Sequence, residues 1–170
     1  MEIWDLYNEQ RQIIGEHIRG TELPENGFHL VVHVWIKNSD GQYLMTQRSR
    51  NKPTFPLMWE CVGGSVIKGE DSLTSALREV EEEVGLQLSP DGGKLLLTQI
   101  RKTINNKRYN DIVDVWLFTY DGLVSLENAT TDEVEQFKWM DKSEIEQLRR
   151  ENKLVYSIKD LSYFFEIMEP

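Results

Sequence analysis

Three glutamates on one predicted helix have the residue type and spacing that could bind a divalent metal ion. Glu79, Glu82 and Glu83 follow one another at i, i+3 and i+4, so a helix brings their carboxylates to one side. Their mutual repulsion disfavours the helix by roughly a few tenths of a kcal/mol per pair. A hard cation such as Mg²⁺ offsets this repulsion because it takes oxygen ligands, and Arg78 can orient the Glu82 carboxylate one turn away. A solvated acidic face is the alternative for these residues taken alone.

The flanking residues predict the helix that positions these carboxylates. Asp71 suits an N-cap and Gly85 suits a C-terminal stop, which bounds the helix at about 72–84. At about 100° per residue, the apolar side chains occupy one arc of core-facing width. They are Leu73, Ala76, Leu77, Val80 and Val84. The three glutamates fall in the neighbouring arc and Glu81 points elsewhere, so the helix should present the carboxylates at the edge of its packed face.

These residues belong to a longer motif that runs from Gly64 to Leu86 and reads GSVIKGEDSLTSALREVEEEVGL. The segment fits the template G-x5-E-x7-R-E-U-x-E-E-x-G-U, with U aliphatic, at every specified position. At ordinary residue frequencies a chance match in such a chain has a probability on the order of 1 in 10^7. The template is the Nudix box, and the chain therefore resembles the Nudix hydrolases, a family that includes MutT-like pyrophosphatases.

The resemblance implies an activity, a cofactor and a set of site residues. The implied reaction is hydrolysis of a phosphoanhydride bond, usually in a nucleoside diphosphate linked to another group. The implied cofactor is Mg²⁺ or Mn²⁺, held by Glu79, Glu82, Glu83 and the backbone carbonyl of Gly64. Glu70 would support these ligands from the outside, and Arg78 completes the implied catalytic set.

The general base and the substrate contacts are less sharply defined. A base must lie within hydrogen-bond reach of the attacking water. The candidates are Glu79 and, beside the loop at 127–132, Glu133 and Glu135; the sequence does not rank them. The residues predicted to contact the substrate are Arg48, Trp59 and Arg108.

Outside the box, the chain resembles the branch that contains isopentenyl-diphosphate isomerase, which makes isomerisation an alternative. The likeness rests on an N-terminal hairpin, the Phe28-His29-Leu30 strand entry and the apolar approach at 55–59. Isomerases place a catalytic cysteine directly before the first box glycine and a metal-binding histidine directly after it, where this chain has Gly63 and Ser65. Cys61 lies two residues too early and is interpreted as a small buried apolar residue. Hydrolysis is therefore favoured, and the complete set of box glutamates also disfavours a non-catalytic binding module.

Composition and charge restrict the remaining classes. The 170 residues, 39% hydrophobic and 28% charged, predict one globular domain over 1–170. No apolar run is as long as the about 18 residues that are needed to cross a bilayer, and the start lacks a secretory pattern. The single cysteine fits a reducing compartment. We therefore expect a cytoplasmic protein. The net charge of −10 argues against nucleic acid and anionic membranes as partners. A small anionic diphosphate, complexed with metal, remains as substrate, and a homodimer is possible because family members are often dimers.

The rest of the chain predicts an α/β fold. The resemblance implies the Nudix α/β/α sandwich, in which a mixed sheet has helices on both faces. An N-terminal hairpin extension is expected over 1–20. Strands are expected at 29–36, 43–48, 95–103, 112–120 and 134–140, with 55–62 leading into the box at 64–86. The polar, basic segment 104–111 is expected to be a loop. Helices are expected to begin at 141 and to cover 157–168.

Overall fold

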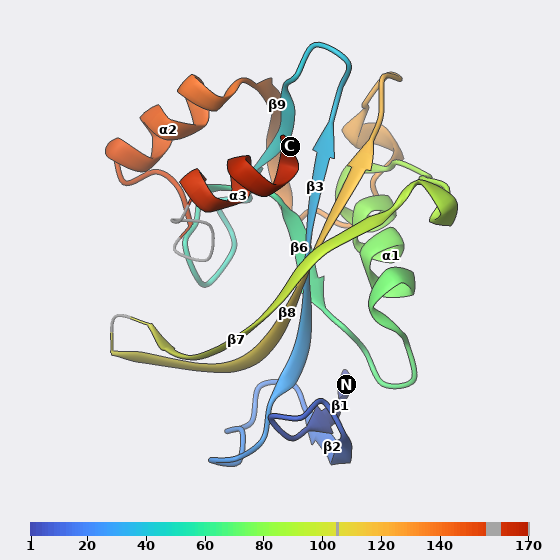
Figure 1. Ribbon diagram of the computed structural model, residues 1–170, viewed down its shortest axis with the longest axis vertical. Coiled ribbons are helices and arrows are strands. Elements are labelled where there is room, and N and C mark those ends of the chain that lie inside the picture. The colour runs from blue at the N-terminus through green and yellow to red at the C-terminus, as the bar shows by residue number, and fades with distance from the viewer. Residues whose placement is uncertain (105, 156–160, 170) are drawn as a thin grey trace.

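A mixed β-sheet separates two hydrophobic cores in the computed structural model, which describes residues 1–104, 106–155 and 161–169 (Figure 1). Within these ranges seven strands form the sheet, in the order β5-β4-β3-β8-β7, with β6 paired to β3 and β9 paired to β4. The strands are β3 His29–Lys37, β4 Tyr43–Arg48, β5 Trp59–Glu60, β6 Val62–Ser65, β7 Lys94–Ile104, β8 Lys107–Thr119 and β9 Val134–Met140. β3 and β8 run parallel to each other, whereas β6 runs antiparallel to β3.

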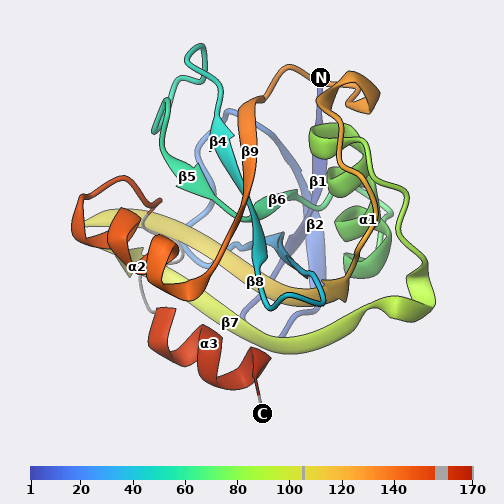
Figure 2. The same cartoon turned by 90° about the horizontal axis from the view of Figure 1, so that it is seen from above.

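The helices cover both faces of this sheet (Figures 1 and 2). Helix α1, Ser72–Val84, lies on one face, and helices α2, Lys142–Arg150, and α3, Leu161–Met168, lie on the other. Alternation along β3 divides the two cores, because Val32 and Val34 pack with α1 whereas Trp35 packs with α2 and α3. The predicted α/β/α sandwich is confirmed.

The N-terminal hairpin is also confirmed. Strands β1, Ile3–Tyr7, and β2, Ile13–Ile18, form a separate two-stranded sheet below the start of β3. At the hairpin tip, Arg11 donates hydrogen bonds of 2.7 and 2.6 Å from Nη1 and Nη2 to the buried carboxylate of Asp114 on β8. Thr98 of β7 donates a further hydrogen bond of 2.6 Å to the same carboxylate. The hairpin is therefore fixed to the main sheet by a charge-assisted contact.

The prediction of a loop at 104–111 is wrong. β7 continues to Ile104 and β8 begins at Lys107, with Thr103 paired to Arg108 and Ile104 paired to Lys107. Asn106, with a φ of +63°, lies at the tight turn between them. The run is polar because this end of the hairpin extends beyond the main sheet (Figure 1), so hydrophobic alternation could not reveal the strands.

The C-terminal third follows the sequence expectations where it is described. Asp141 and Glu144 form the capping box that begins α2, and α3 confirms the last helix from residue 161 onward; residues 157–160 of that prediction lie outside the described residues.

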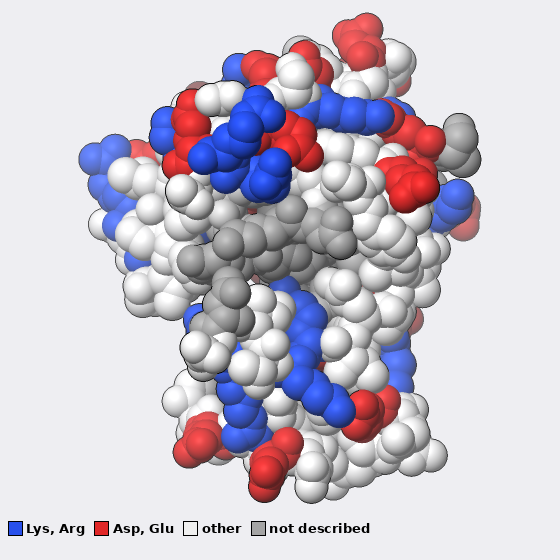
Figure 3. Space-filling view, turned by 60° about the vertical axis from the view of Figure 1, so that its left-hand side comes forward, with Lys and Arg blue, Asp and Glu red and all other residues white. Residues whose placement is uncertain are grey.

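Figure 3 shows acidic and basic side chains interspersed over the upper part of one face. None of the described helices is long and apolar enough to span a bilayer.

Candidate active site

Helix α1 begins and ends at the predicted residues. The Asp71 side chain accepts a hydrogen bond of 2.7 Å from the backbone N–H of Thr74, and Gly85 adopts a φ of +71°. A Cβ atom at Gly85 would lie 2.5 Å from Cβ of Asn128 and 2.6 Å from its carbonyl carbon. Only glycine satisfies both the left-handed backbone and this close approach, which sets the position of the last turn of α1.

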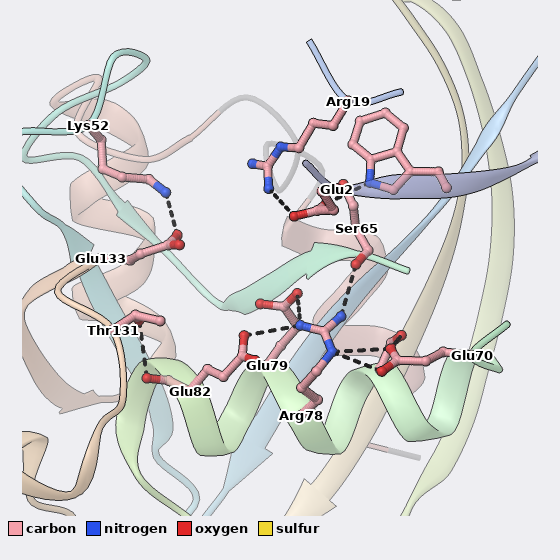
Figure 4. A network of polar contacts seen from close by, with 12 residues as sticks. Glu2, Arg19, Lys52, Ser65, Glu70, Arg78, Glu79, Glu82, Thr131 and Glu133 are labelled. Atoms are coloured by element: carbon pink, nitrogen blue, oxygen red, sulfur yellow. Dashed lines mark hydrogen bonds and ion pairs between the residues drawn. The ribbon is translucent and has the colours of Figure 1, made fainter. Parts of the chain in front are cut away.

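The loop after residue 128 is held against the same end of the helix. The backbone carbonyl of Glu82 accepts hydrogen bonds from the backbone N–H groups of Thr130, at 3.0 Å, and Thr131, at 3.2 Å, and from the Thr131 hydroxyl, at 3.1 Å. Glu133 lies two residues after Thr131 and forms an ion pair with Lys52 (Figure 4). The loop therefore brings Glu133 close to the carboxylates of α1.

Arg78 connects the acidic residues of the box (Figure 4). Its Nε lies 3.1 and 3.2 Å from the two carboxylate oxygens of Glu70. Its Nη1 donates to Glu79 at 2.9 Å and to Glu82 at 3.0 Å, and its Nη2 donates to the backbone carbonyl of Ser65 at 3.1 Å. The prediction that Arg78 orients Glu82 is confirmed, and Glu70 acts on the other carboxylates through Arg78.

Two of the three clustered glutamates are largely withdrawn from solvent. Glu83 is 6% exposed, and the Glu79 side chain is 12% exposed. Burial raises the pKa of Glu79 to about 7 and the pKa of Glu83 well above its ordinary range, and the charge of Glu133 adds to both shifts. A solvated acidic face is therefore wrong for these two residues, whereas Glu81, which was predicted to point away from them, is exposed.

Gly64 lies directly against the Glu79 carboxylate. On β6 it pairs with Val32 of β3 and faces α1. A Cβ atom at this position would lie 2.2 Å from Oε1 of Glu79 and 2.6 Å from Oε2. The structure therefore brings the backbone of Gly64 to the carboxylate with which it is expected to share a ligand.

The carboxylate and carbonyl oxygens of these residues are chemically suited to bind a divalent cation. They are oxygen ligands of the kind that Mg²⁺ and Mn²⁺ bind, and their buried negative charge lacks full compensation. Within the described ranges, no three His, Cys, Asp or Glu side chains already converge on one point. Arg78 bonds through Nη1 to one oxygen of Glu79 and one oxygen of Glu82, so it holds the two carboxylates side by side without using all of their oxygen ligands.

The raised carboxyl pKa values predict how the stability of the metal-free protein depends on pH. The ordinary glutamate pKa is 4.5, and the folded protein raises that of Glu79 to about 7, so the fold favours the protonated form. This contribution to the free energy of unfolding is complete below pH 4.5 and is lost as the pH rises through 7. Glu83 acts in the same direction.

In EDTA, the melting temperature should therefore fall between pH 7 and pH 8, measured by calorimetry or circular dichroism. Below about pH 6.5 the lowered pKa values of His29 and His33 act in the opposite direction, because the fold favours their neutral form. The pKa of Asp114 is lowered from 3.8, so its contribution to the free energy of unfolding is lost only in more acidic solution. Excess Mg²⁺ should recover the loss at pH 8, because a ligand that binds only the folded state stabilises it. A metal-free melting temperature that is constant or rises over this interval would contradict the prediction.

Two of the predicted substrate contacts lie close to the box. Arg48 donates from Nη1 to Glu60 at 2.7 Å and from Nε to the backbone carbonyl of Thr54 at 2.9 Å. Trp59 is half-buried against the core beneath α2 and α3, and its backbone N–H donates to the carbonyl of Lys153. Both side chains are therefore held by the protein itself.

The third predicted substrate contact, Arg108, and the candidate base Glu135 have other partners. Arg108 donates from Nη2 to the backbone carbonyls of Leu23 and Pro24, at 3.1 and 2.6 Å, and lines cavities beside the linker at 20–27. Glu135 accepts hydrogen bonds from Arg50 at 3.0 and 2.5 Å, and these bonds lower its pKa. Of the two late candidates for the base, Glu133 and not Glu135 contributes charge to the buried cluster.

Two residues of the site were missed by sequence reasoning. Burial raises the pKa of Glu60, and its charge raises that of Glu83. A single acid between Trp59 and Cys61, within an otherwise apolar approach, was the available signal. His33 is buried on β3, and burial together with the charge of Arg101 lowers its pKa to about 3; nothing in the sequence distinguished it.

Comparison with known proteins agrees with this fold and with the family resemblance. The NUDIX domain family model matches residues 27–161. An uncharacterised Nudix hydrolase of Listeria monocytogenes is 35% identical over 167 residues, which cover 97% of this chain and 91% of that protein. The match includes most of the chain, so this protein belongs to the Nudix hydrolase family.

Solved structures agree at the level of the fold. A crystal structure of a Deinococcus radiodurans protein has a TM-score of 0.75 at 22% identity, covering 94% of this chain and 96% of that one. A bifunctional NMN adenylyltransferase/ADP-ribose pyrophosphatase of Francisella tularensis, in complex with AMP and a manganese ion, has a TM-score of 0.64 at 20% identity, covering 87% of this chain and 43% of that one. At such identities the likeness shows a shared fold.

Proposed function

We propose that this protein hydrolyses a phosphoanhydride bond, with Mg²⁺ or Mn²⁺ as cofactor. The substrate would be a nucleoside diphosphate linked to another moiety, or a related small diphosphate. The observation that carries the proposal is the pair formed by buried Glu83 and largely buried Glu79, with Gly64 lying against Glu79 and Arg78 holding Glu79 and Glu82. Family membership supports the hydrolase class, and the manganese and AMP in the Francisella protein support the choice of cofactor and substrate.

The residues of the site would have different roles in this reaction. Glu79, Glu82, Glu83 and the Gly64 carbonyl would hold the metal ion. When bound, the ion neutralises the diphosphate and its leaving oxygen, which lowers the barrier by charge stabilisation. Arg78 would keep the carboxylates oriented, a role supported by its hydrogen bonds of 2.9 and 3.0 Å to Glu79 and Glu82.

Proton transfer requires a further group. A base that takes the proton from the attacking water has to lie at the cluster. Glu79 and Glu133 both meet this condition, since each acts electrostatically on Glu83. Glu79 is also a proposed metal ligand, so Glu133, which is paired with Lys52, is the better candidate for the base.

Isomerisation of a diphosphate is disfavoured by the position before the box. Gly63 has no proton to donate, and a Cβ atom there would lie 2.5 Å from the backbone oxygen of Val32, so the strand leaves no room for a catalytic side chain. Cys61 is 4% exposed, and burial raises the pKa of its thiol. The interpretation of Cys61 as a buried core residue is thereby confirmed.

The decisive experiment is a substrate panel with product analysis. Nucleoside diphosphates, triphosphates, sugar nucleotides, dinucleotides and isopentenyl diphosphate are incubated with Mg²⁺, with Mn²⁺ and with EDTA. We expect release of phosphate or a nucleoside monophosphate that requires the metal. The net charge of −10 and the single buried cysteine support a small diphosphate substrate in a cytoplasmic setting. An intact anhydride throughout the panel would overturn the proposal.

A further inference from the structure

Lys52 brings a positive charge to the carboxylates of the candidate site. It forms an ion pair with Glu133, and its side chain is only 21% exposed. Burial raises the pKa values of Glu83 and Glu60, and the charge of Lys52 acts against both shifts. Figure 4 shows the ion pair on the side of α1 from which the carboxylates of the box project. One ammonium group therefore acts on carboxylates from three separate parts of the fold.

Backbone hydrogen bonds fix the position of this ion pair. The backbone N–H of Ser49, a buried residue, donates a hydrogen bond of 2.8 Å to the backbone carbonyl of Glu133. The backbone N–H of Lys52 donates one of 3.1 Å to the carbonyl of Ser49. The segment 49–52 is thereby attached to the start of β9. The ammonium group is therefore placed by the main chain and not only by the contact of two long side chains.

The two arginines beside these carboxylates are held more firmly than Lys52. Arg48 donates to Glu60 at 2.7 Å and to the backbone carbonyl of Thr54 at 2.9 Å, and Arg78 is bound to several acceptors within the box. Within the described part of the chain, Lys52 forms a single ion pair, and its stem is long and flexible. Lys52 is therefore the cation that can move when the charge of the site changes.

We propose that Lys52 is the internal counter-ion of the metal-free site, a positioning residue that holds Glu133 at the carboxylate cluster and opposes the binding of a divalent ion there. This inference rests on the proposed function and concerns the regulation of that same site. The ammonium group and a divalent ion are both positive and act on the same carboxylates, so each weakens the attraction of the other to them. The affinity for the metal is therefore set by Lys52 as well as by the ligands.

The first test measures the metal affinity of the full chain without substrate. Mn²⁺ is titrated into the wild type, Lys52→Met and Lys52→Arg, and the free ion is measured by electron paramagnetic resonance. Methionine keeps an unbranched stem without the charge, and arginine keeps the charge. We expect K52M to bind Mn²⁺ about fivefold more tightly, the equivalent of one partly exposed ionic interaction, and K52R to stay within about twofold of the wild type. Equal or weaker binding by K52M, as expected of a purely structural lysine, would overturn the proposal.

Arg50→Gln is the matched control for this titration. Arg50 comes from the same segment, pairs with Glu135 at 3.0 Å from Nε, and has a side chain that is 69% exposed. Glu133, and not Glu135, adds its charge to the buried glutamates. R50Q therefore removes one cation and one ion pair outside the cluster, where salt screens the charge, and its Mn²⁺ affinity should stay within about twofold of the wild type. An equal gain in R50Q and K52M would assign the effect to net charge and overturn the proposal.

The second test compares melting temperatures in EDTA and in excess Mn²⁺. In EDTA, K52M should melt below the wild type, because the carboxylates lose their counter-ion, and K52R should melt close to the wild type. Excess Mn²⁺ should then raise the melting temperature of K52M by more than it raises that of the wild type, because tighter binding to the folded state stabilises it more. A deficit in K52M that persists undiminished in Mn²⁺ would show a loss of packing and overturn the proposal.

The two levels of inference fail separately. Absence of Mn²⁺ binding by the wild type would count against the proposed function, and the melting curves in EDTA would still decide on Lys52, since equal melting temperatures of K52M and R50Q would overturn its role. Metal-dependent turnover by the wild type, with unchanged Mn²⁺ affinity in K52M, would overturn the inference about Lys52 alone. A raised KM in K52M with unchanged Mn²⁺ affinity would do the same and would make Lys52 a substrate contact.

Discussion

Replacing Glu83 with glutamine should abolish metal-dependent turnover and at the same time stabilise the metal-free protein. Glu83 is buried near Glu60, Glu79 and Glu133, and their charges raise its pKa. The neutral amide removes one member of this buried anionic cluster, so the fold loses a repulsion. It also removes one proposed metal ligand, so we expect kcat/KM to fall by about 10²–10³-fold.

The measurement is a pair of readouts on one variant. Melting curves in EDTA at pH 8 should show an increase in melting temperature for E83Q over the wild type. Addition of Mg²⁺ should then raise the melting temperature less than it does in the wild-type protein, because the variant binds the ion more weakly.

Glu81→Gln is the matched control. Glu81 lies on the same helix, is exposed, and accepts a hydrogen bond of 3.0 Å from Gln87. The substitution changes the net charge by the same amount, but outside the cluster, and we expect turnover close to wild type. Full activity of E83Q, or an equal loss in E81Q, would remove the proposed role of Glu83.

The helix that carries the site could be predicted because its signals are local. Asp71 and Gly85 mark the two ends through backbone rules that act within a few residues. The spacing of Arg78 and Glu82 fixes their contact through helix geometry alone. These parts of the site depend on the sequence of one element, and each agrees with the structure.

The parts that were missed depend on contacts between distant elements. A cavity lies beside His33 because β6 pairs with β3, and no pattern within β3 reveals which histidine borders it. Glu60 joins the cluster because Glu83 comes from the helix that follows. The strands around Asn106 were mistaken for a loop because an extended hairpin with polar faces lacks the alternation that identifies a strand.

The two adjacent glycines at the start of the box should respond in opposite ways to alanine. At Gly64 the nearest obstacle to a Cβ atom is the end of the flexible Glu79 side chain, at 2.2 Å, whereas at Gly63 it is the backbone oxygen of Val32, at 2.5 Å. A side-chain end can move at little expense, but a backbone oxygen within the β3–β6 pair cannot. Gly64→Ala should therefore keep the fold, and Gly63→Ala should destabilise it by roughly 1–3 kcal/mol, as overpacking does.

The two alanine substitutions should distinguish an effect on activity from an effect on stability. In G64A the added methyl group displaces the Glu79 carboxylate from the backbone it now touches, and a displacement of about 1 Å in a reacting site costs about 10²-fold in rate. We expect kcat/KM of G64A to fall by about that factor while its denaturant midpoint stays near or slightly above that of the wild type, because alanine restricts the unfolded chain. Wild-type turnover by G64A would show that the contact between Gly64 and Glu79 does not position the reacting groups. Loss of stability in G64A equal to that in G63A would show that the Glu79 side chain is rigidly packed and does not move aside for a methyl group.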